Sequence, residues 1–310
     1  MIGAMLVCEQ RDADQTWSGL VAVVAGLPVR VVWEVISAGQ CLRVAGPAEL
    51  SWWWPRIGPQ VPGVAAGPLV SVAGHPQVRL PENVTAADAR RWINAHLHCV
   101  HLRCETLSVH GVAVAREGRA VVLLGGHGAG KSLTGLALMT GHAWRSVAGD
   151  TVLIQVRERA APMVIGGTSA YLVRRRETHR WFPELPLPMG SGDRVDISHQ
   201  PALGDHPGFP LVGVIQVAVD AGRSGTGSVT RCEEHIARNA WYRASGHLLD
   251  KVLDDHHADP LRLVEDKELA RRRARLVRFL AASTGCGWIC GDPHRMAAAI
   301  SRVSGREAAR

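Results

Sequence analysis

One glycine-rich segment near the middle of the chain constrains the fold more than any other feature. It fits the pattern G-x-x-x-x-G-K-[ST] at every position, with the sequence Gly125-Gly126-His127-Gly128-Ala129-Gly130-Lys131-Ser132. The apolar run 121–124 before it predicts a buried strand, and residues 133–139 after it predict a helix. A strand, a glycine loop and a helix in this order are typical of phosphate-binding loops. The segment therefore predicts an α/β fold with a nucleotide site at the start of a helix.

The residue types in this loop suit a nucleotide phosphate. Glycines allow consecutive backbone N–H groups to point inward, and the helix start adds its positive dipole at the same point. Lys131 can reach the β- and γ-phosphates, and the Ser132 hydroxyl can bind Mg²⁺. The sequence contains no Asn/Thr-Lys-x-Asp guanine-specificity motif, which favours ATP. The loop, together with Leu133 of the following helix, is therefore expected to bind ATP and Mg²⁺.

Composition limits the kind of protein. The chain has 310 residues, of which 46% are hydrophobic and 20% charged, as expected for a globular protein of one large or two ordinary domains. Lys and Arg total 35 and Asp and Glu 28, so the net charge of +7 favours anionic partners such as nucleotides, phosphorylated substrates or acidic peptides. No basic stripe with interleaved aromatic residues is present, which argues against nucleic acid.

Localisation is predicted from apolar runs and cysteines. No stretch approaches the ~20 apolar residues of a membrane span, and the first residues lack a basic leader. These features predict a cytoplasmic protein without a membrane partner. The seven cysteines, an odd number, are then expected to be mostly reduced thiols.

Residues 1–83 are expected to form a smaller, β-rich N-terminal domain. Glycine and proline separate short apolar or β-branched runs at residues 19–24, 29–35, 41–44 and 69–72. Three consecutive tryptophans, Trp52, Trp53 and Trp54, lie in this region. They could form a stacking platform, but one or two core rings with a residue at the edge is the favoured interpretation.

Residues 84–310 are expected to form the nucleotide-binding domain. Thr85 as a cap and Asp88 in the first turn predict a helix to about Cys104. Strands are predicted at residues 107–115, 151–156, 211–219 and 287–291, with a hairpin turn at 116–118. Helices are predicted at 231–244, 266–283 and from Pro293 onwards. Residues 157–210 are rich in Pro, Gly and Arg and are expected to be irregular, with a possible role as a functional flap.

Two stretches beside the loop carry a family resemblance. Residues 108–114 contain the pair His110-Gly111 before the hairpin, and residues 147–152 place Gly149 and Asp150 at the start of a strand. Together with the loop they resemble the kinase domain of HPr kinase/phosphorylase and its HPr-kinase-like relatives. The resemblance covers roughly residues 100–300, is strongest over 107–156, and extends to the strand at 211–219. The N-terminal region resembles nothing that we can name.

The resemblance implies a P-loop kinase domain with a mixed β-sheet that moves the γ-phosphoryl group of ATP to a hydroxyl. It assigns Lys131 and Ser132 to the phosphates and Mg²⁺, His110 to the edge of the active site, and Asp150 to the second of two acidic positions. The acceptor would be a serine of a peptide or protein, or a small hydroxylated metabolite. The family archetype is a hexamer, so a homo-oligomer is an open expectation.

This chain departs from the family at one position. The family usually has two acidic residues in a row and uses the first as the base toward the acceptor hydroxyl, whereas this chain has Gly149 there. Asp150 could both orient the acceptor hydroxyl and hold Mg²⁺. Alternatively, another group such as His110 could approach the acceptor, or transfer could be slow or lost. Phosphoryl transfer depends mainly on positioning and charge neutralisation, so the departure does not exclude it. The rival hypotheses are a nucleotide-binding regulatory protein and a plain ATPase, and we expected Gly149→Asp to separate the first of these from a kinase.

Several other clusters have both a functional and a structural interpretation. His98, His101 and Cys104 follow one another at i,i+3 on the predicted helix and could present a three-ligand zinc face. Alternatively, the Cys and Leu residues of this helix face the core and its histidines are solvated or capped. The cluster 254–259 is expected to be a solvated loop, and the segment 204–208 could help to hold the acceptor.

Two arginine runs complete the candidates. Arg174, Arg175 and Arg176 could neutralise an anion or form a solvated edge. Arg271, Arg272, Arg273, Arg275 and Arg278 are expected to form a solvated helix face.

Overall fold

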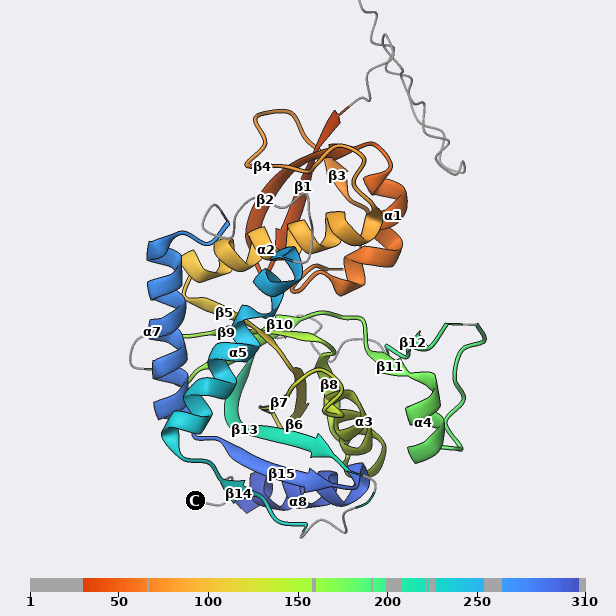
Figure 1. Ribbon diagram of the computed structural model, residues 1–310, viewed down its shortest axis with the longest axis vertical. Helices are drawn as coiled ribbons and strands as arrows, with labels where there is room; N and C mark the ends of the chain where they lie inside the picture. The colour runs from red at the N-terminus through yellow and green to blue at the C-terminus, as the bar shows by residue number, and fades with distance from the viewer. Residues whose placement is uncertain are drawn as a thin grey trace, which may run out of the picture.

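The computed structural model describes residues 30–65, 67–157, 160–190, 192–198, 208–220, 222, 227–253 and 264–306. It is a mixed α/β protein with a small N-terminal sheet, a large mixed sheet and a two-stranded sheet. In Figure 1 the small sheet lies at one end of the molecule and the large sheet, with its helices, forms the rest. Three stretches singled out above fall wholly or mostly outside the described residues: the strand expected at 19–24, the segment 204–207 and the cluster 254–259.

The small sheet is built on the hairpin of β1 (Arg30–Ser37) and β2 (Gln40–Pro47). Ala38 and Gly39 both have positive φ, at 49° and 77°, as a two-residue hairpin turn requires. β3 (Val70–Ser71) and β4 (Val78–Arg79) complete the order β3-β1-β2-β4. The strands predicted at 29–35, 41–44 and 69–72 are therefore confirmed in position.

The three tryptophans lie on α1 (Leu50–Ile57), which is followed by the 3₁₀ turn η1 (Gly58–Gln60). Trp54 is 5% exposed in the core, Trp52 is 65% exposed, and Trp53 is partly buried. This confirms the interpretation of core rings with a residue at the edge. Helical periodicity explains the split, because adjacent residues of a helix point about 100° apart.

Helix α2 (Ala86–Arg103) is shared by two hydrophobic cores. It begins as predicted, with the Asp88 backbone N–H donating to Thr85 Oγ1 at 3.2 Å. Trp92 and Leu97 pack in the core of the small sheet, whereas Cys99 and Leu102 pack in a core of the large sheet. The two sheets are therefore joined through one helix.

The large sheet is mixed, with the order β5-β9-β10-β13-β7-β6-β8. β14 (Thr230–Arg231) pairs with β15 (Gly287–Gly291), which in turn runs parallel to β13 (Phe209–Val219). β13 also runs parallel to β7 (Arg119–Leu124), and β7 forms the predicted hairpin with β6 (Val112–Arg116). β8 (Arg145–Ala148) pairs with β6, while β5 (Thr106–His110) and β10 (Met163–Gly167) flank β9 (Thr151–Gln155).

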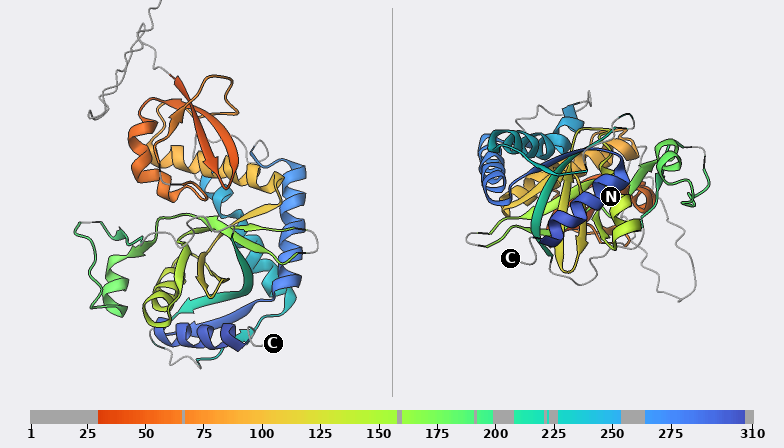
Figure 2. Two further views of the ribbon diagram at one scale, coloured as in Figure 1. Left: turned by 180° about the vertical axis from the view of Figure 1, so that it is seen from behind. Right: turned by 90° about the horizontal axis from the view of Figure 1, so that it is seen from below.

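Helices cover both faces of the large sheet (Figures 1 and 2). α3 (Lys131–His142) and α8 (Pro293–Arg306) share one core with β6, β7 and β13, and α5 (Glu234–Leu253) and α7 (Lys267–Thr284) share the other. The predictions at 133–139, 231–244, 266–283 and beyond 293 are confirmed. α5, however, continues nine residues past the predicted end at residue 244.

The expectation that residues 157–210 are irregular is wrong for much of this stretch. β10 pairs with both β9 and β13 inside the large sheet. β11 (Leu172–Arg174), α4 (Arg175–Trp181) and β12 (Arg194–Asp196) form an arm that projects from the body of the molecule in Figure 1. Partners distant in sequence stabilise these short elements, so local composition did not reveal them.

The small sheet also contacts the segment after β10. The Ala170 N–H donates to the Pro59 carbonyl at 2.9 Å, and the Gly63 N–H donates to the Gly167 carbonyl at 2.8 Å. These two hydrogen bonds tie residues 167–170 to η1 and to the residues just after it. No helix in the described part of the chain combines the length and apolar character needed to cross a bilayer.

Candidate functional site

A cavity of about 570 Å³ opens where the glycine loop (residues 125–130), the β8–β9 connection and helices α2 and α5 meet. The loop follows the carboxyl end of β7, and Val219 at the carboxyl end of the parallel neighbour β13 also lines the cavity. This edge of parallel strands is where α/β proteins commonly bind ligands. The polar residues lining it are Gln60, Arg90, Arg91, His110, His127, Lys131, Ser132, Asp150, Thr168, Arg174, Glu177, Arg194, His247 and Lys251.

The glycine loop sits tightly on the end of β13. Gly130 caps α3 with a φ of 86°, and a Cβ there would collide with the Val219 side chain. The Val219 N–H donates to the Ala129 carbonyl at 2.9 Å. Only glycine combines this φ with this close contact, which explains the residue at position 130. The predicted order of strand, loop and helix is confirmed.

The structure places most, but not all, of the predicted loop residues at the cavity. His127, Gly128, Gly130, Lys131, Ser132 and Leu133 line it, whereas Gly125, Gly126 and Ala129 do not. Gly125 instead packs against Val217, whose carbonyl oxygen would lie 2.9 Å from a Cβ at this position. Gly125, Gly126 and Ala129 therefore belong to the part of the loop that does not line the cavity.

Lys131 is almost buried, with 7% of its surface exposed. Its Nζ donates to the carbonyls of Gly125 at 3.0 Å and Gly126 at 3.1 Å, so the side chain folds over the loop. Burial, opposed by Asp150 and assisted by Lys251, lowers the pKa of Lys131 to about 8. A buried, poorly neutralised ammonium group at the start of a helix is suited to an anion.

Asp150 and His110 meet because their backbones are paired. β5 ends opposite the start of β9, with His110 facing Thr151, and the Gly111 N–H donates to the Asp150 carbonyl at 2.9 Å. His110 Nε2 lies 3.6 Å from Asp150 Oδ1. The Asp150 side chain remains 41% exposed, so its carboxylate is available to a ligand in the cavity.

Two functional candidates on α5 were not predicted. The His247 ring stacks on the His110 ring with 3.8 Å between centroids and 12° between planes, and Lys251 Nζ lies 4.0 Å from Asp150 Oδ2. The i,i+4 spacing of His247 and Lys251 puts both on one helix face. That spacing was visible in the sequence, but the predicted helix ended before them.

The charges around Asp150 shift its neighbours together. Burial first, and then the charges of Lys131 and Lys251, lower the pKa of His110 to about 3 and of His247 to about 4, although Asp150 opposes the shift. Both imidazoles are therefore neutral at physiological pH. Burial alone would raise the pKa of Asp150, but Lys251 and the two histidines lower it below its ordinary value. Asp150 is a carboxylate at neutral pH, beside two imidazoles that can accept a proton or a hydrogen bond.

Gly149 lies at a position where no side chain fits. A Cβ on Gly149 would collide with the carbonyl oxygen of Ala170 and lie 2.9 Å from Tyr171 Cα. The Gly149 N–H donates to the Thr168 carbonyl at 3.0 Å, and the Thr168 hydroxyl accepts from the N–H groups of Asp150 and Thr151. The missing first acidic residue therefore coincides with a close backbone approach of residues 168–171.

Arginines from three elements line the rest of the cavity. Arg90 and Arg91 lie on α2, Arg174 ends β11, and Arg194 begins β12. Arg194 Nη2 contacts His127 Nε2 at 3.2 Å, which links the arm to the glycine loop. Of the run 174–176, only Arg174 lines the cavity, and Arg175 donates to the Pro188 carbonyl at 2.8 Å.

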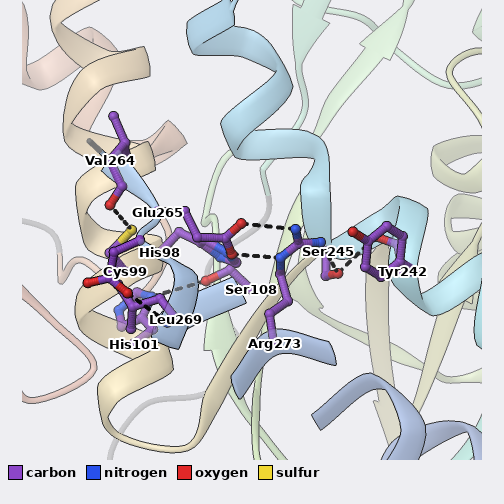
Figure 3. Close-up of polar contacts among 11 residues, drawn as sticks. His98, Cys99, His101, Ser108, Tyr242, Ser245, Val264, Glu265, Leu269 and Arg273 are labelled. Carbon is purple, nitrogen blue, oxygen red and sulfur yellow. Dashed lines mark hydrogen bonds and ion pairs between the residues drawn. The ribbon is translucent and has the colours of Figure 1, made fainter. Parts of the chain in front are cut away.

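The three candidate zinc ligands have separate partners, and Figure 3 shows two of these pairs, His98 with Glu265 and His101 with Ser108. His101 is buried between two serine hydroxyls, with Nε2 at 2.8 Å from Ser37 Oγ and Nδ1 at 3.1 Å from Ser108 Oγ. His98 lies 3.9 Å from Glu265, and Cys104 donates to the Gln40 side-chain oxygen. Over the residues that the structure describes, no three metal-ligating side chains converge. In the alternative interpretation, the Cys and Leu residues do face the core, as Cys99 and Leu102 show, but the option of solvated histidines is wrong because both rings are buried.

The arginine run on α7 is likewise only partly solvated. Arg273 is 7% exposed and forms a bidentate ion pair with Glu265, with Nε–Oε1 at 2.7 Å and Nη2–Oε2 at 3.0 Å. Tyr242 packs its ring under the guanidinium of Arg273, 4.7 Å from its centroid (Figure 3). Arg272 and Arg275 are more exposed and contact Glu105. The prediction of a solvated face therefore fails at Arg273.

These features define a mixed α/β protein with a cation-lined cavity at the carboxyl ends of parallel strands. Comparison with models of protein families gives no match, and a search of curated proteins returns no similar sequence.

Proposed function

We propose that this protein is an ATP-dependent kinase that transfers the γ-phosphoryl group to a hydroxyl acceptor. The observation that carries the proposal is the convergence of Lys131, at the start of α3, with Asp150 and His110 in one cavity. The resemblance of residues 107–156 to the HPr-kinase-like domain supports the same reaction. The mixed sheet with α3 directly after β7 is compatible with a P-loop kinase domain.

The loop residues would bind the nucleotide. Backbone N–H groups of the glycine loop and the Lys131 ammonium group would neutralise the β- and γ-phosphates. The nucleotide oxygens would displace the Gly125 and Gly126 carbonyls as partners of Lys131 Nζ. Leu133 lines the cavity beside the loop and packs in the core of the large sheet.

The donor set at the cavity fits Mg²⁺. This ion is usually held by one or two protein oxygens, substrate phosphates and water. The Ser132 hydroxyl and the exposed Asp150 carboxylate are such oxygens, and both line the cavity. Bound there, the ion would supply charge neutralisation on the phosphates.

Asp150 and the stacked histidines would orient the acceptor. In transfer, a bond forms between the acceptor oxygen and the γ-phosphorus while the bond from that phosphorus to the ADP oxygen breaks. The acceptor hydroxyl loses its proton to Asp150 or to the neutral His110 beside it. Since the transition state is loose, holding the hydroxyl in line matters more than a strong base. Because no side chain fits at Gly149, Asp150 would be the carboxylate that takes this part.

A nucleotide-binding regulatory protein is the second candidate, and Gly149 is the observation that favours it. In that case the cavity would bind ATP without transferring phosphate. Gly149→Asp cannot separate the two functions as expected from the sequence, because the new side chain would collide with the Ala170 backbone.

The test is to measure ADP release from Mg-ATP with and without a pool of serine peptides and hydroxylated metabolites, followed by mass analysis of the pool. A kinase would give a phosphorylated product that disappears with Lys131→Ala and decreases by about 10²-fold or more with Asp150→Asn. Lys267→Ala, on the exposed start of α7, is the matched control. ADP release independent of any acceptor would indicate an ATPase, and tight ATP binding without turnover would indicate the regulatory protein.

A further inference from the structure

The cavity contains more positive charge than a nucleotide would use. Among the described residues that line it, six are Lys or Arg and two are Asp or Glu. Magnesium cancels part of the triphosphate charge, and the loop amides and Lys131 already face the phosphates. The remaining cations therefore need another explanation.

Three of these cations have at most a distant carboxylate partner among the described residues. The Arg90 guanidinium donates to the Gln60 side-chain oxygen, and no described carboxylate lies within ion-pair distance of it. The partner of Arg194 in the cavity is the imidazole of His127. Lys251 has Asp150 at 4.0 Å as its partner. We name Arg90, Arg194 and Lys251 the cationic wall.

The cationic wall lines the same cavity as Asp150 and the glycine loop. Lys131 and Lys251 both act on the Asp150 carboxylate, one from the glycine loop and one from α5. In an in-line transfer the acceptor approaches the γ-phosphate from the side opposite the leaving ADP. Arg90 comes from α2, Arg194 from the arm and Lys251 from α5, so three separate elements present positive charge to the cavity.

We infer that the acceptor carries an anionic group, a carboxylate or a phosphate, in addition to its hydroxyl, and that Arg90, Lys251 and Arg194 bind this group. The inference rests on the proposed kinase function and deepens it. Guanidinium groups bind carboxylates and phosphates through paired hydrogen bonds, and a second anchor would fix the distance between the anion and the reacting hydroxyl. Like charges held together in a partly buried cavity disfavour the folded state, which an anionic ligand would offset.

The experiment measures anion binding directly. The full chain is saturated with Mg²⁺ and the β,γ-imido analogue of ATP and then titrated with inorganic phosphate and with malonate at constant ionic strength. Calorimetry gives the affinities for the wild type, Arg90→Gln, Lys251→Gln and the control Arg238→Gln on the exposed face of α5. The Kd of the preferred probe is expected to rise about tenfold or more in the first two variants and to stay unchanged in the control.

Each result decides the inference. If the wild type and both wall variants bind each anion with the same affinity, the inference is overturned. Binding of the ATP analogue in that case would leave the kinase proposal standing. Failure of the analogue to bind would count against the kinase, and titration of Lys131→Ala with the same anions would then test the wall alone. Preference for phosphate or for malonate identifies which anion the acceptor carries. The wall variants are expected to fold with an unchanged or raised Tm, because each removes a like charge.

Discussion

The backbone carbonyl of Ala170 occupies the space that a side chain on Gly149 would need. The resemblance to HPr-kinase-like domains predicts an acidic residue at this position, and the Ala170 backbone leaves no room for one. Thr168 holds the arrangement through hydrogen bonds to Gly149, Asp150 and Thr151. This region is therefore a packed structural feature, and a single substitution cannot reverse it.

Gly149→Ala is expected to lower the free energy of unfolding by about 1–3 kcal/mol or more, because its Cβ overlaps backbone atoms that cannot move independently. Gly149→Asp is expected to be at least as destabilising and to give no gain of transfer. Gly141→Ala on α3 is the control, since a Cβ there meets nothing within 4 Å and alanine favours the helix. Urea unfolding measures all three, and a Gly149→Ala protein as stable as the wild type would contradict the close contact.

Nucleotide affinity is expected to depend on the Lys131 proton. Burial lowers the pKa of Lys131 to about 8, so the side chain loses its positive charge as the pH rises above 8. The affinity for the Mg²⁺-bound ATP analogue should then fall by up to about tenfold per pH unit between roughly pH 8 and 10. Lys131→Arg keeps its charge over this range and should give a flat profile, whatever its absolute affinity. Parallel profiles for the two proteins would refute this assignment.

Acid should destabilise the fold through buried histidines. Burial lowers the pKa of His101 to about 3, with His98 as a second cause, so the folded protein binds fewer protons than the unfolded chain between about pH 6.5 and 3. Stability is therefore full above pH 6.5 and is lost as the pH falls, by about 1.4 kcal/mol per pH unit for each such histidine. His110 and His247 act in the same direction.

His101→Gln should reduce this pH dependence while lowering stability at pH 7, because it replaces the ring bonded to Ser37 and Ser108. Thermal unfolding from pH 7 to 4 gives the slope. His179→Gln, on the exposed side of α4, serves as the comparison. A slope equal to the wild-type slope in His101→Gln would show that this ring does not carry the effect.

The buried pair Glu265–Arg273 should be sensitive to the loss of either partner. Glu265→Gln or Arg273→Met leaves a buried charge without its counter-ion and is expected to cost about 3–5 kcal/mol. The double substitution should cost less than the sum of the two, which a double-mutant cycle in urea measures. The exposed pair Glu234–Arg238 provides the comparison, with an expected coupling of about 0.3–0.5 kcal/mol. Additive effects at Glu265 and Arg273 would mean that the pair is not coupled.

Local patterns predicted much of the fold. The glycine loop, the Thr85 cap and the apolar run before Val219 each specify their own element, and all three are present. The short strands β10, β11 and β12 were missed because residues 157–210 are rich in Pro, Gly and Arg, and pairing with other strands, not local composition, stabilises them. The continuation of α5 past residue 244 was missed although it buries Leu249 and Val252 in the core, because Gly246, just beyond the predicted end, is a poor helix former.

The site was predictable only where neighbouring residues belong to one motif. Lys131, Ser132, His110 and Asp150 come from two adjacent motifs, and the cavity brings them together. Arg90, Arg194, His247 and Lys251 are contributed by three distant elements, and no local pattern distinguishes them from solvated residues. The buried state of His98, His101 and Arg273 was missed for the same reason, since their partners Ser37, Ser108 and Glu265 lie elsewhere in the sequence.

The sharing of α2 between two cores determines what a shortened version of this protein could be. A chain beginning at residue 84 would keep the glycine loop and Asp150, but Trp92, Ile93 and Leu97 would lose their covering from the small sheet. It would also lose Pro59 and Gly63, which hold the segment facing Gly149, and Gln60, which contacts Arg90. The smallest autonomous unit that retains the cavity wall therefore extends back to β1, and excision at residue 84 should yield an aggregation-prone fragment.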